Sequence, residues 1–521
     1  MTIRTHRREG RGNRPDPAEP LDAFHLAHPG GRPAFGMLTE AGMATLRARV
    51  LDLLETHGVI IRHPPGKAAM LRAGARDGTD EDRLRLPREL VEEALAATPK
   101  TVTLYGKTPA RDIALPRADQ GFVMRTGTGA HGFVDPIDGS YRNLRLSDVA
   151  SIAAVANHLD QVGFIAHPFV HGVPELTADI HGFAALTAAT DKHCWIQPYN
   201  TENVAYLMRL AALAAGGEAA LRARPSASCI VCSFTPLEFK IMDTEAMIQS
   251  GRYGLPIHAC SLPSAGGTAP ITGPGMVLMA AAEIVAMVTK AHVLAPGTPV
   301  IATPLMFTLD MRTGRALQSC VESLQSVAMV VQLMKRCFGL VTHSYGAGSD
   351  TPDVDAQSMA ERALIAQTVA LAGADILGGV GQLECATVFS PVQAVLDNEL
   401  GGMVRRFISP PVIDDETLNW AEVSARPAGS HFLDSRHTLK YCRHQFTPDV
   451  LLRENRDSYE ASGRRTAIDK ARDLCLDLLR RPPPAGLPDE AVRRDMAAVV
   501  AAGDADILGA ETARRRELVR V

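Results

Sequence analysis

The segment Thr342–Asp350 (THSYGAGSD) concentrates side chains that could do chemistry. Within nine residues it holds an imidazole, a phenol, a carboxylate and two glycines, which is a high density for a purely structural turn. His343 could act directly in catalysis, and a histidine hydrogen-bonded at the end of a strand would explain it equally well. Gln197, which follows another short apolar run, has the same two interpretations.

Aromatic and carboxylate side chains follow several other apolar runs. Phe234, Phe307 and Tyr345 offer ring faces, and Asp350 and Glu384 offer negative charge. Aromatic faces attract quaternary ammonium groups through their quadrupoles, and carboxylates add charge attraction. The pattern therefore favours a cationic amine as ligand. The alternative is that the rings are ordinary core or rim residues.

Metal ligands are poorly supported by the spacing of cysteine and histidine. Cys229 and Cys232 form a C-x-x-C pair on an expected strand, where side chains three apart face opposite sides. His258 and Cys260 could share a strand face, but no H-E-x-x-H motif or second ligand pair accompanies them. We therefore expect no bound metal.

Lysine is scarce where a Schiff-base enzyme would need it. Between residues 120 and 410 only four lysines occur, and we place each at a strand entrance or on a helix: Lys192, Lys240, Lys290 and Lys335. This argues against Schiff-base aldolases and decarboxylases.

The segment Gly127–Gly132 (GTGAHG) matches the G-x-G-x-x-G dinucleotide pattern after a strand. No helix is expected at its third glycine, because FVDPIDGS follows. A loop that lets the backbone approach a ligand is therefore favoured over nucleotide binding.

A repeating unit must position these groups. From residue 120 to about 410, short apolar runs alternate with loops and helix-length amphipathic segments. The strand candidates begin at Phe122, Val162, Cys194, Cys229, Pro256, Val300, Phe338 and Ala374. The helix candidates begin near Ser147, Glu175, Glu202, Glu238, Gly275, Arg315, Asp355 and Pro391.

Eight such units predict an α/β protein built on a closed (β/α)8 TIM barrel, whose reactive groups lie at the carboxyl ends of the strands. A doubly wound open sheet is the alternative, but it needs a topological switch point that the uniform repeat does not suggest. The barrel is assigned to residues 116–410. Residues 1–34 are expected to be a disordered basic tail, 35–115 an N-terminal α/β accessory region, and 411–521 a C-terminal helical extension.

Composition excludes other partners. The net charge of −4 provides no global positive field for nucleic acid. The apolar stretch 276–295 contains Glu283, Lys290 and His292, so it predicts a buried helix and no membrane span. Nine cysteines, an odd number, and no secretory signal favour a reducing cytoplasm.

The same loops carry a resemblance to a known family. The chain resembles the trimethylamine methyltransferase family, corrinoid-dependent enzymes, over most of its length to about residue 480. The similar segments are GTGAH near Gly127, LPSAGGTAPIT from Leu262, HSYGAGSDTPDVDAQ from His343, ADILGGVGQLE from Ala374, LDNELGGMVRRFI from Leu396 and HFLDSRHTLKYCR from His431.

The resemblance implies methyl transfer from a methylated amine to the cobalt of a corrinoid (cobalamin), usually held on a separate protein. Family members that use trimethylamine carry pyrrolysine in the loop after the seventh strand, at a position equivalent to about Pro352. This loop contains standard residues only. The resemblance is therefore to the branch without pyrrolysine, some members of which demethylate glycine betaine.

These considerations combine into one hypothesis for the site. Phe234, Phe307 and Tyr345 are expected to form a cation cage that Gln197 supports. Asp350 and Glu384 are expected to bind or orient the amine, and His343, like Gln197, to support it. His343, Asp350 and Glu384 are the expected catalytic residues. A corrinoid protein, free cobalamin or tetrahydrofolate could accept the methyl group, and a homo-oligomer is expected. A non-catalytic barrel that binds betaine-like ligands is the alternative from another class.

Overall fold

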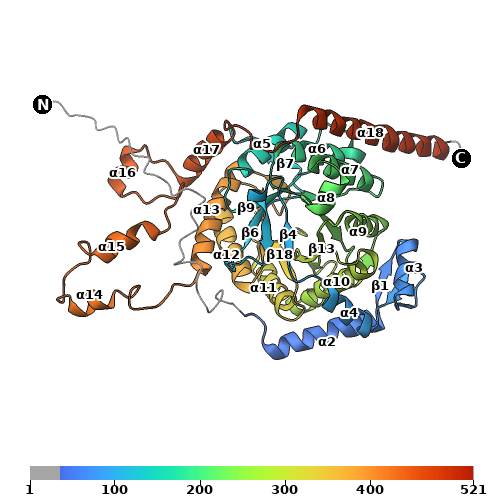
Figure 1. The fold of residues 1–521 in the computed structure, drawn as a ribbon, viewed down its shortest axis with the longest axis horizontal. Coiled ribbons are helices and arrows are strands. Elements are labelled where there is room, and N and C mark those ends of the chain that lie inside the picture. The colour runs from blue at the N-terminus through green and yellow to red at the C-terminus, as the bar shows by residue number, and fades with distance from the viewer. Residues whose placement is uncertain (1–35, 520–521) are drawn as a thin grey trace.

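A computed structural model describes residues 36–519 of the chain, with side chains to residue 513. The expected tail, residues 1–34, lies outside the described residues. A ring of helices surrounds a barrel of strands at the centre of Figure 1, with the N-terminal elements (blue) on one flank and the C-terminal elements (red and orange) on the others.

The central sheet is a closed, parallel, eight-stranded barrel in the order β10-β11-β13-β15-β18-β19-β6-β9. All eight expected strands are present, so the barrel prediction is confirmed. Their bounds are β6 Val123–Thr126, β9 Val162–Ala166, β10 His193–Ile196, β11 Ala227–Cys232, β13 Ile257–Ser261, β15 Val300–Pro304, β18 Val341–Tyr345 and β19 Ile376–Val380.

Each strand leads to a helix of the outer ring. These helices are α5 Leu146–Ala156, α6 Ala178–Ala189, α7 Asn203–Ala215, α9 Ile241–Tyr253, α10 Gly273–Leu294, α11 Val321–Arg336, α12 Ala356–Ala372 and α13 Pro391–Ile408. A short α8, Glu218–Ala223, follows α7.

Two of the expected helix starts are wrong. Glu238 belongs to strand β12, Glu238–Phe239, which pairs with the N-terminal region, so the helix begins later at Ile241. Arg315 lies before β17, Ala316–Leu317, which pairs with β16, Phe307–Leu309. Backbone pairing with neighbouring segments outcompetes helix formation at both positions.

Helix α10 is long and apolar enough to cross a membrane by length and composition alone, but 72% of its apolar window is buried inside the protein. Its charged side chains are partnered there. Glu283 accepts hydrogen bonds from Ser233 and Ser261, each at 2.5 Å, and Lys290 donates to Thr244 at 3.1 Å. The prediction of a buried helix is confirmed.

The N-terminal region packs against the outside of the barrel and against its lower end, where the amino ends of the strands lie. It contains α2 Glu40–Thr56, α3 Pro64–Arg72, α4 Arg88–Ala97 and the strands β1 Val59–Ile61, β2 Arg76–Asp77 and β3 Arg83–Arg85. The hairpin of β4, Val102–Leu104, and β5, Ile113–Leu115, covers the amino ends of the barrel strands. His193 Nδ1 at the start of β10 donates to the Tyr105 carbonyl at 2.9 Å, so this end is closed.

Two small sheets lie at the opposite, carboxyl end. One contains β7 Gly132–Val134, β8 Tyr141–Asn143, β20 Gln382–Leu383 and β21 Val388–Phe389. The other contains β14 Ser264–Ala265 with β16 and β17. They form part of the rim around the end where barrel enzymes hold their reactive groups.

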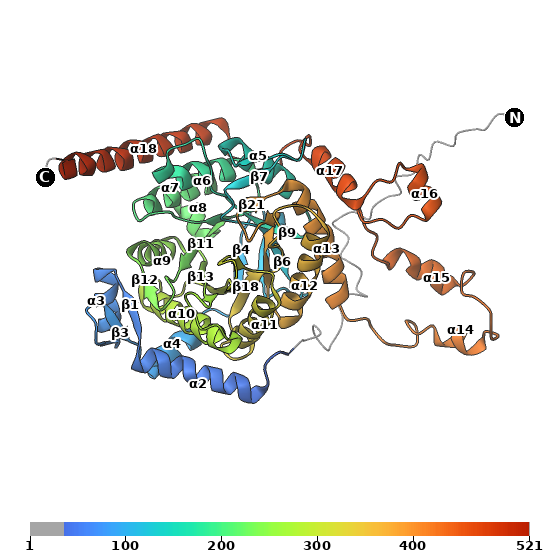
Figure 2. The same cartoon turned by 180° about the vertical axis from the view of Figure 1, so that it is seen from behind.

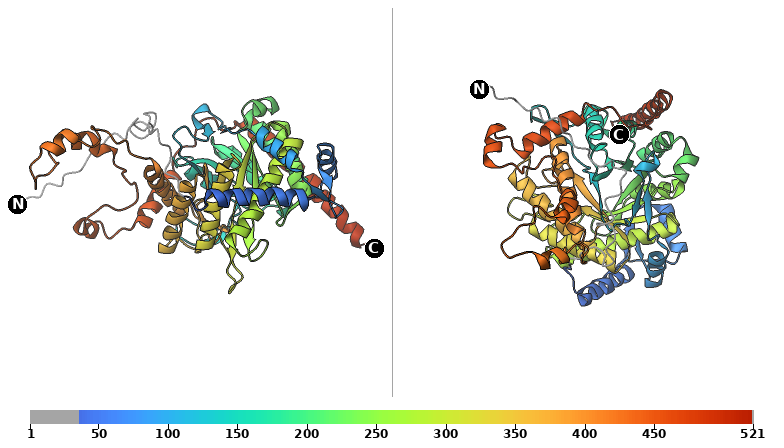
Figure 3. Two further views of the ribbon diagram at one scale, coloured as in Figure 1. Left: turned by 90° about the horizontal axis from the view of Figure 1, so that it is seen from below. Right: turned by 60° about the vertical axis from the view of Figure 1, so that its left-hand side comes forward.

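Three C-terminal helices extend away from the barrel (Figures 1 and 2): α14 Trp420–Ala425, α15 Arg436–Tyr441 and α16 Arg456–Ala461. The other two pack on the outer helices, α17 Ala467–Leu478 against α13 and α18 Glu490–Val519 against α6 and α7. Helices α14 and α15 contain no buried residue, and Figure 3 shows them projecting to one side. We call residues 411–445 the C-terminal arm.

Candidate active site

One layer of the barrel interior is polar and aromatic. Arg125, Trp195, His258 and His343 point to the barrel axis from β6, β10, β13 and β18, and all are fully buried. The Arg125 guanidinium carbon lies 4.5 Å from the Trp195 ring centroid, and the Trp195 and His258 centroids are 4.3 Å apart. Barrel interiors are usually filled by branched apolar residues, so this layer is unusual.

His343 lies inside strand β18, not in the loop after it, because the strand continues to Tyr345. Its Nε2 accepts a hydrogen bond from Arg125 Nε at 2.9 Å. Burial and the neighbouring Arg125 charge hold the pKa of His343 well below its usual range. The imidazole is therefore neutral and orients the guanidinium.

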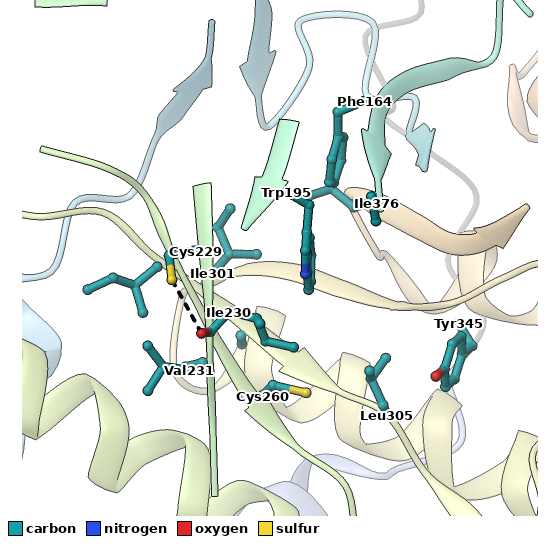
Figure 4. Close-up of a cluster of buried hydrophobic side chains, with 14 of the residues drawn as sticks. Phe164, Trp195, Cys229, Ile230, Val231, Cys260, Ile301, Leu305, Tyr345 and Ile376 are labelled. Carbon is teal, nitrogen blue, oxygen red and sulfur yellow. Dashed lines mark hydrogen bonds between the residues drawn. The ribbon is translucent and has the colours of Figure 1, made fainter. Parts of the chain in front are cut away.

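Tyr345 stands one layer closer to the open end, on the same face of β18 as His343. Its ring meets Phe307 of β16 edge to face, with centroids 5.9 Å apart. Burial raises the pKa of Tyr345 well above its usual range, so the hydroxyl stays protonated. Figure 4 shows Tyr345 to one side of Trp195, with Leu305 next to the tyrosine. Phe307 and Tyr345, both expected in the site, are thus brought together.

Phe234 is placed differently from the other two aromatic candidates. It lies in the turn between β11 and β12, is 53% exposed, and carries Lys240 Nζ 4.0 Å from its ring centroid. A cation of the chain itself therefore occupies one face of this ring. Lys240 precedes α9 in the segment after β11, so the expectation that it lies at a strand entrance or on a helix was wrong.

Asp350 is held by backbone groups. Its two carboxylate oxygens accept from the N–H groups of Gln318 and Ser319, each at 2.9 Å, and this ties the loop after β18 to the loop after β17. Burial raises the pKa of Asp350 above its usual range. A carboxylate used in this way positions loops at the rim.

Glu384 lies in the turn between β20 and β21, with Arg315 Nη2 3.8 Å from its Oε1. Glu384, Cys385 and Ala386 all have positive φ angles, of 48°, 51° and 75°. Three consecutive residues other than glycine in the left-handed region are a strained conformation, of the kind that concentrates at functional sites.

Gln197 takes part in a polar cluster at the rim. Thr128 Oγ1 donates to Gln197 Oε1, and Gln382 Nε2 donates to the Thr128 carbonyl. A Cβ on Gly127 would lie 1.9 Å from Gln382 Cγ, so this glycine is required for close packing. The strand β7, and no helix, begins at Gly132, which supports the loop interpretation of GTGAHG.

Two of the nine cysteines, Cys232 and Cys260, lie on the inner face of the barrel. All nine are free thiols, and the described residues contain no group of three His, Cys, Asp or Glu side chains that could hold a metal ion. Cys232 and Cys260 face each other across β11 and β13, since they are register partners. The C-x-x-C partner Cys229 points away from the axis, as the strand alternation predicts.

Solvent reaches the interior from the open end. Ser228, Ile230 and Cys232 alternate toward the axis on β11, and Ser228 hydrogen-bonds inward to His258 Nε2 at 2.9 Å. Cys232 is partly exposed, and Ile230, one layer deeper, retains 7% exposure. Solvent therefore approaches the polar layer along this side of β11.

Sequence reasoning missed Arg125 and Trp195. The available signal was an arginine inside an otherwise buried strand run, VMRT, where a solvent-facing alternation is absent. The pairing of Arg125 with His343, 218 residues apart, has no local signature.

The fold and this interior can be compared with known proteins. Residues 4–507 match the family model described as trimethylamine methyltransferase. The chain belongs to the trimethylamine methyltransferase family. The family resemblance and the activity class expected from it, methyl transfer, are therefore confirmed.

Relatives of this family member are distant in sequence. It is 27% identical over 459 residues to a trimethylamine methyltransferase of Desulfitobacterium hafniense DCB-2, covering 88% of this chain and 92% of the relative. It is 25% identical over 434 residues to a glycine betaine methyltransferase of D. hafniense Y51, covering 82% and 88%. The crystal structure of the Methanosarcina barkeri monomethylamine methyltransferase has 13% identity and a TM-score of 0.50, over 88% of this chain and 91% of that one, which supports the barrel fold.

Proposed function

We propose that this methyltransferase family member moves a methyl group from a quaternary amine, a betaine such as glycine betaine, to the cobalt of a corrinoid. The observation that carries the proposal is the Phe307–Tyr345 pair at the open end of the barrel, directly above a polar layer. The ring faces of such a pair provide an apolar, electron-rich wall for a trimethylammonium group.

The chemistry of a quaternary donor suits the protonation states of these residues. When the C–N bond breaks, the bonding pair stays on nitrogen and a neutral tertiary amine leaves without needing a proton. A corrinoid in the Co(I) state, as methyl acceptor, would supply the electron pair of the new bond to the methyl carbon. His343 is neutral and Tyr345 remains protonated. The chain's contribution is then to hold the cation in line and exclude water.

The loop after β18 supports a donor that needs no covalent activation. It contains standard residues only, and Pro352 is exposed on it. Asp355 caps α12 by accepting from the Ser358 N–H at 2.7 Å, which ends the loop. A quaternary ammonium already has a leaving group, so no adduct-forming side chain is required there.

The acceptor is proposed to arrive on a separate corrinoid protein. The lower end of the barrel is covered by the β4–β5 hairpin, so the carboxyl end is the side open to an acceptor. Tetrahydrofolate is the alternative acceptor and forms the second arm of the test.

The decisive assay mixes the full-length protein with glycine betaine and cob(I)alamin under anaerobic reducing conditions and follows the methylcobalamin spectrum. Formation above a no-enzyme control is expected, and Tyr345→Leu should slow it on the order of 100-fold through loss of positioning. Arg252→Met, on the outer end of α9, is the matched control. Methyl transfer to tetrahydrofolate alone would overturn the corrinoid proposal, and transfer to neither acceptor would overturn both.

We also propose that the protein is a homo-oligomer in which the C-terminal arm packs against a second copy. The arm exposes large apolar side chains without covering them in its own chain: Ile413, Leu418, Trp420, Val423, Phe432, Leu433 and Leu439. Contiguous exposed apolar surface of this kind marks protein–protein contacts. A monomer by light scattering at micromolar concentration would contradict this.

A further inference from the structure

Arg125 is a buried cation without an anionic partner. Its side chain is fully buried, Nε donates to His343 at 2.9 Å and Nη1 donates to the Thr126 carbonyl at 2.7 Å. Nη2 has no hydrogen-bond partner among the described residues. Within the same part of the chain, no Asp or Glu oxygen lies in ion-pair distance of this guanidinium, in contrast to the other fully buried arginine, Arg362.

A buried guanidinium with an unpaired nitrogen destabilises the fold unless a bound group accepts its remaining hydrogen bonds. A buried charge loses its hydration and is normally paired or hydrogen-bonded at every donor. Burial lowers the pKa of Arg125 only to about 10, so the group stays charged at neutral pH. The barrel interior therefore holds a permanent positive charge with one free N–H-bearing nitrogen.

The surroundings fix the guanidinium in place. The Trp195 ring lies beneath it, His343 holds Nε, and Gly378 of β19 makes room for it. A Cβ on Gly378 would lie 2.7 Å from His343 Nε2 and 3.0 Å from Arg125 Cζ. Gly378 is also the register partner of Tyr345, so Arg125 lies just below the level of the Phe307–Tyr345 pair.

We propose that Arg125 is the anchor for the carboxylate of the methyl donor, which defines the donor as a zwitterion with a quaternary ammonium close to a carboxylate. This inference rests on the proposed function and specifies its substrate class. The carboxylate accepts from Arg125 Nη2, and Trp195 Nε1, a second buried donor without a partner, lies in the same layer. The residual exposure of Ile230 and Cys232 marks the side of the barrel from which the donor enters.

The anchor sets the direction of the donor. Residues two apart on a strand are about 6.6 Å apart, which separates the Arg125–His343 layer from the Tyr345 layer. A carboxylate hydrogen-bonded to Arg125 then places an ammonium one or two carbons away at the level of the Phe307 and Tyr345 rings. The N-methyl groups point to the open end, where the acceptor enters.

The test measures binding separately from turnover. Isothermal titration of the full-length protein with glycine betaine, and with choline as the probe that lacks the carboxylate, is performed without any acceptor. Wild-type protein should bind glycine betaine on the order of 100-fold more tightly than choline, because choline would leave the charged donor unpaired. Arg125→Met should remove this preference, Arg125→Lys should retain part of it, and Arg252→Met should leave it unchanged.

Folding of each variant is checked by circular dichroism. If Arg125→Met does not fold, the wild-type ratio and Arg125→Lys decide the matter. Equal binding of choline and glycine betaine by wild-type protein, or an unchanged preference in Arg125→Met, overturns the anchor. Methyl transfer from choline or tetramethylammonium at the rate seen with glycine betaine would also contradict the role of Arg125 as carboxylate anchor. The proposal of methyl transfer from a quaternary amine would still stand. A third outcome separates the two proposals. If Arg125→Met loses the preference for glycine betaine over choline, but wild-type protein transfers a methyl group to no acceptor, the proposed function is rejected and the carboxylate anchor is supported.

Discussion

Two fully buried arginines of this protein differ in how completely their charge is paired. Arg362 on α12 donates from Nη1 to both oxygens of Asp397, at 3.0 and 2.8 Å, and from Nε to Ser358. Asp397 is completed by Gly381 N–H and Gln393. Arg125, in the barrel interior, has a neutral histidine and a carbonyl as partners and one nitrogen without any.

The difference separates a structural charge from a functional one. The Arg362–Asp397 pair closes on itself and connects the outer helices to the turn that carries Gln382, whose carbonyl also accepts from Arg362. The Arg125 charge is complete only when an anion joins it. Buried polar groups that the fold leaves unsatisfied are expected where a ligand binds.

The largest change in the free energy of unfolding is expected from breaking the Arg362–Asp397 ion pair. Asp397→Asn leaves Arg362 as an uncompensated buried charge and should lower the free energy of unfolding by about 3–5 kcal/mol. Urea unfolding followed by circular dichroism measures this. Replacing both residues, Arg362→Met with Asp397→Leu, should recover most of the loss, and a loss as large as that of the single variant would argue against charge pairing as the cause.

A buried carboxylate without a cation should respond to pH. Asp179 on α6 accepts from the Tyr199 N–H at 2.8 Å and from Asn203, and burial raises its pKa to about 6. Because this folded-state pKa exceeds the unfolded value near 3.9, its stabilising contribution is present below about pH 4 and is lost as the pH rises through 6. The full change corresponds to about 3 kcal/mol.

Asp179→Asn should remove this decline. The free energy of unfolding of wild-type protein should fall between about pH 4 and 6 relative to that of the variant, and the two pH profiles should run parallel outside this range. Parallel profiles would show that Asp179 titrates normally and that its hydrogen bonds alone compensate its burial.

Removing the incompletely paired charge of Arg125 should change stability little in the absence of ligand. Arg125→Met is expected to change the free energy of unfolding by no more than about 1 kcal/mol, or to raise it, because an incompletely paired buried charge is replaced by an apolar side chain. Saturating glycine betaine should raise the melting temperature of wild-type protein and not that of the variant. A destabilisation as large as that of Asp397→Asn would place Arg125 in the structural class.

The smallest effect on the barrel is expected from the arm. Leu433→Ser with Leu439→Ser should leave the free energy of unfolding of the isolated subunit within about 0.5 kcal/mol, because both side chains are exposed in it. The measurement that should change is the oligomeric state by light scattering, in favour of monomer. An unchanged assembly would remove the arm from the interface.

The barrel itself could be predicted because each strand and helix has a local signal. Runs such as VGFIA and VIATP carry the apolar content of buried parallel strands, and all eight formed where expected. Helix starts failed at Glu238 and Arg315, where pairing with distant β1 or with the β16 hairpin decided the structure. The pairing with β1 has no local signature, and the β16–β17 hairpin is a short-range contact that helical periodicity does not detect.

The site was only partly predictable for the same reason. Phe307 and Tyr345 were selected by type and strand position, and the fold brings them together. Phe234 was selected by the same rule, yet the β11–β12 turn places it under Lys240. Asp350 was expected to bind or orient the amine, and the structure shows both of its carboxylate oxygens accepting from backbone N–H groups.

The sequence by itself determined the barrel, the family and the end of the barrel where the chemistry is expected, because periodicity and motif spacing are properties of neighbouring residues. Only the tertiary structure decided which charges are paired. Arg125 meets His343 across 218 residues, and Arg362 meets Asp397 across 35. Whether a buried charge is fully paired depends on every group around it, and these groups come from separate elements that only the folded structure brings together.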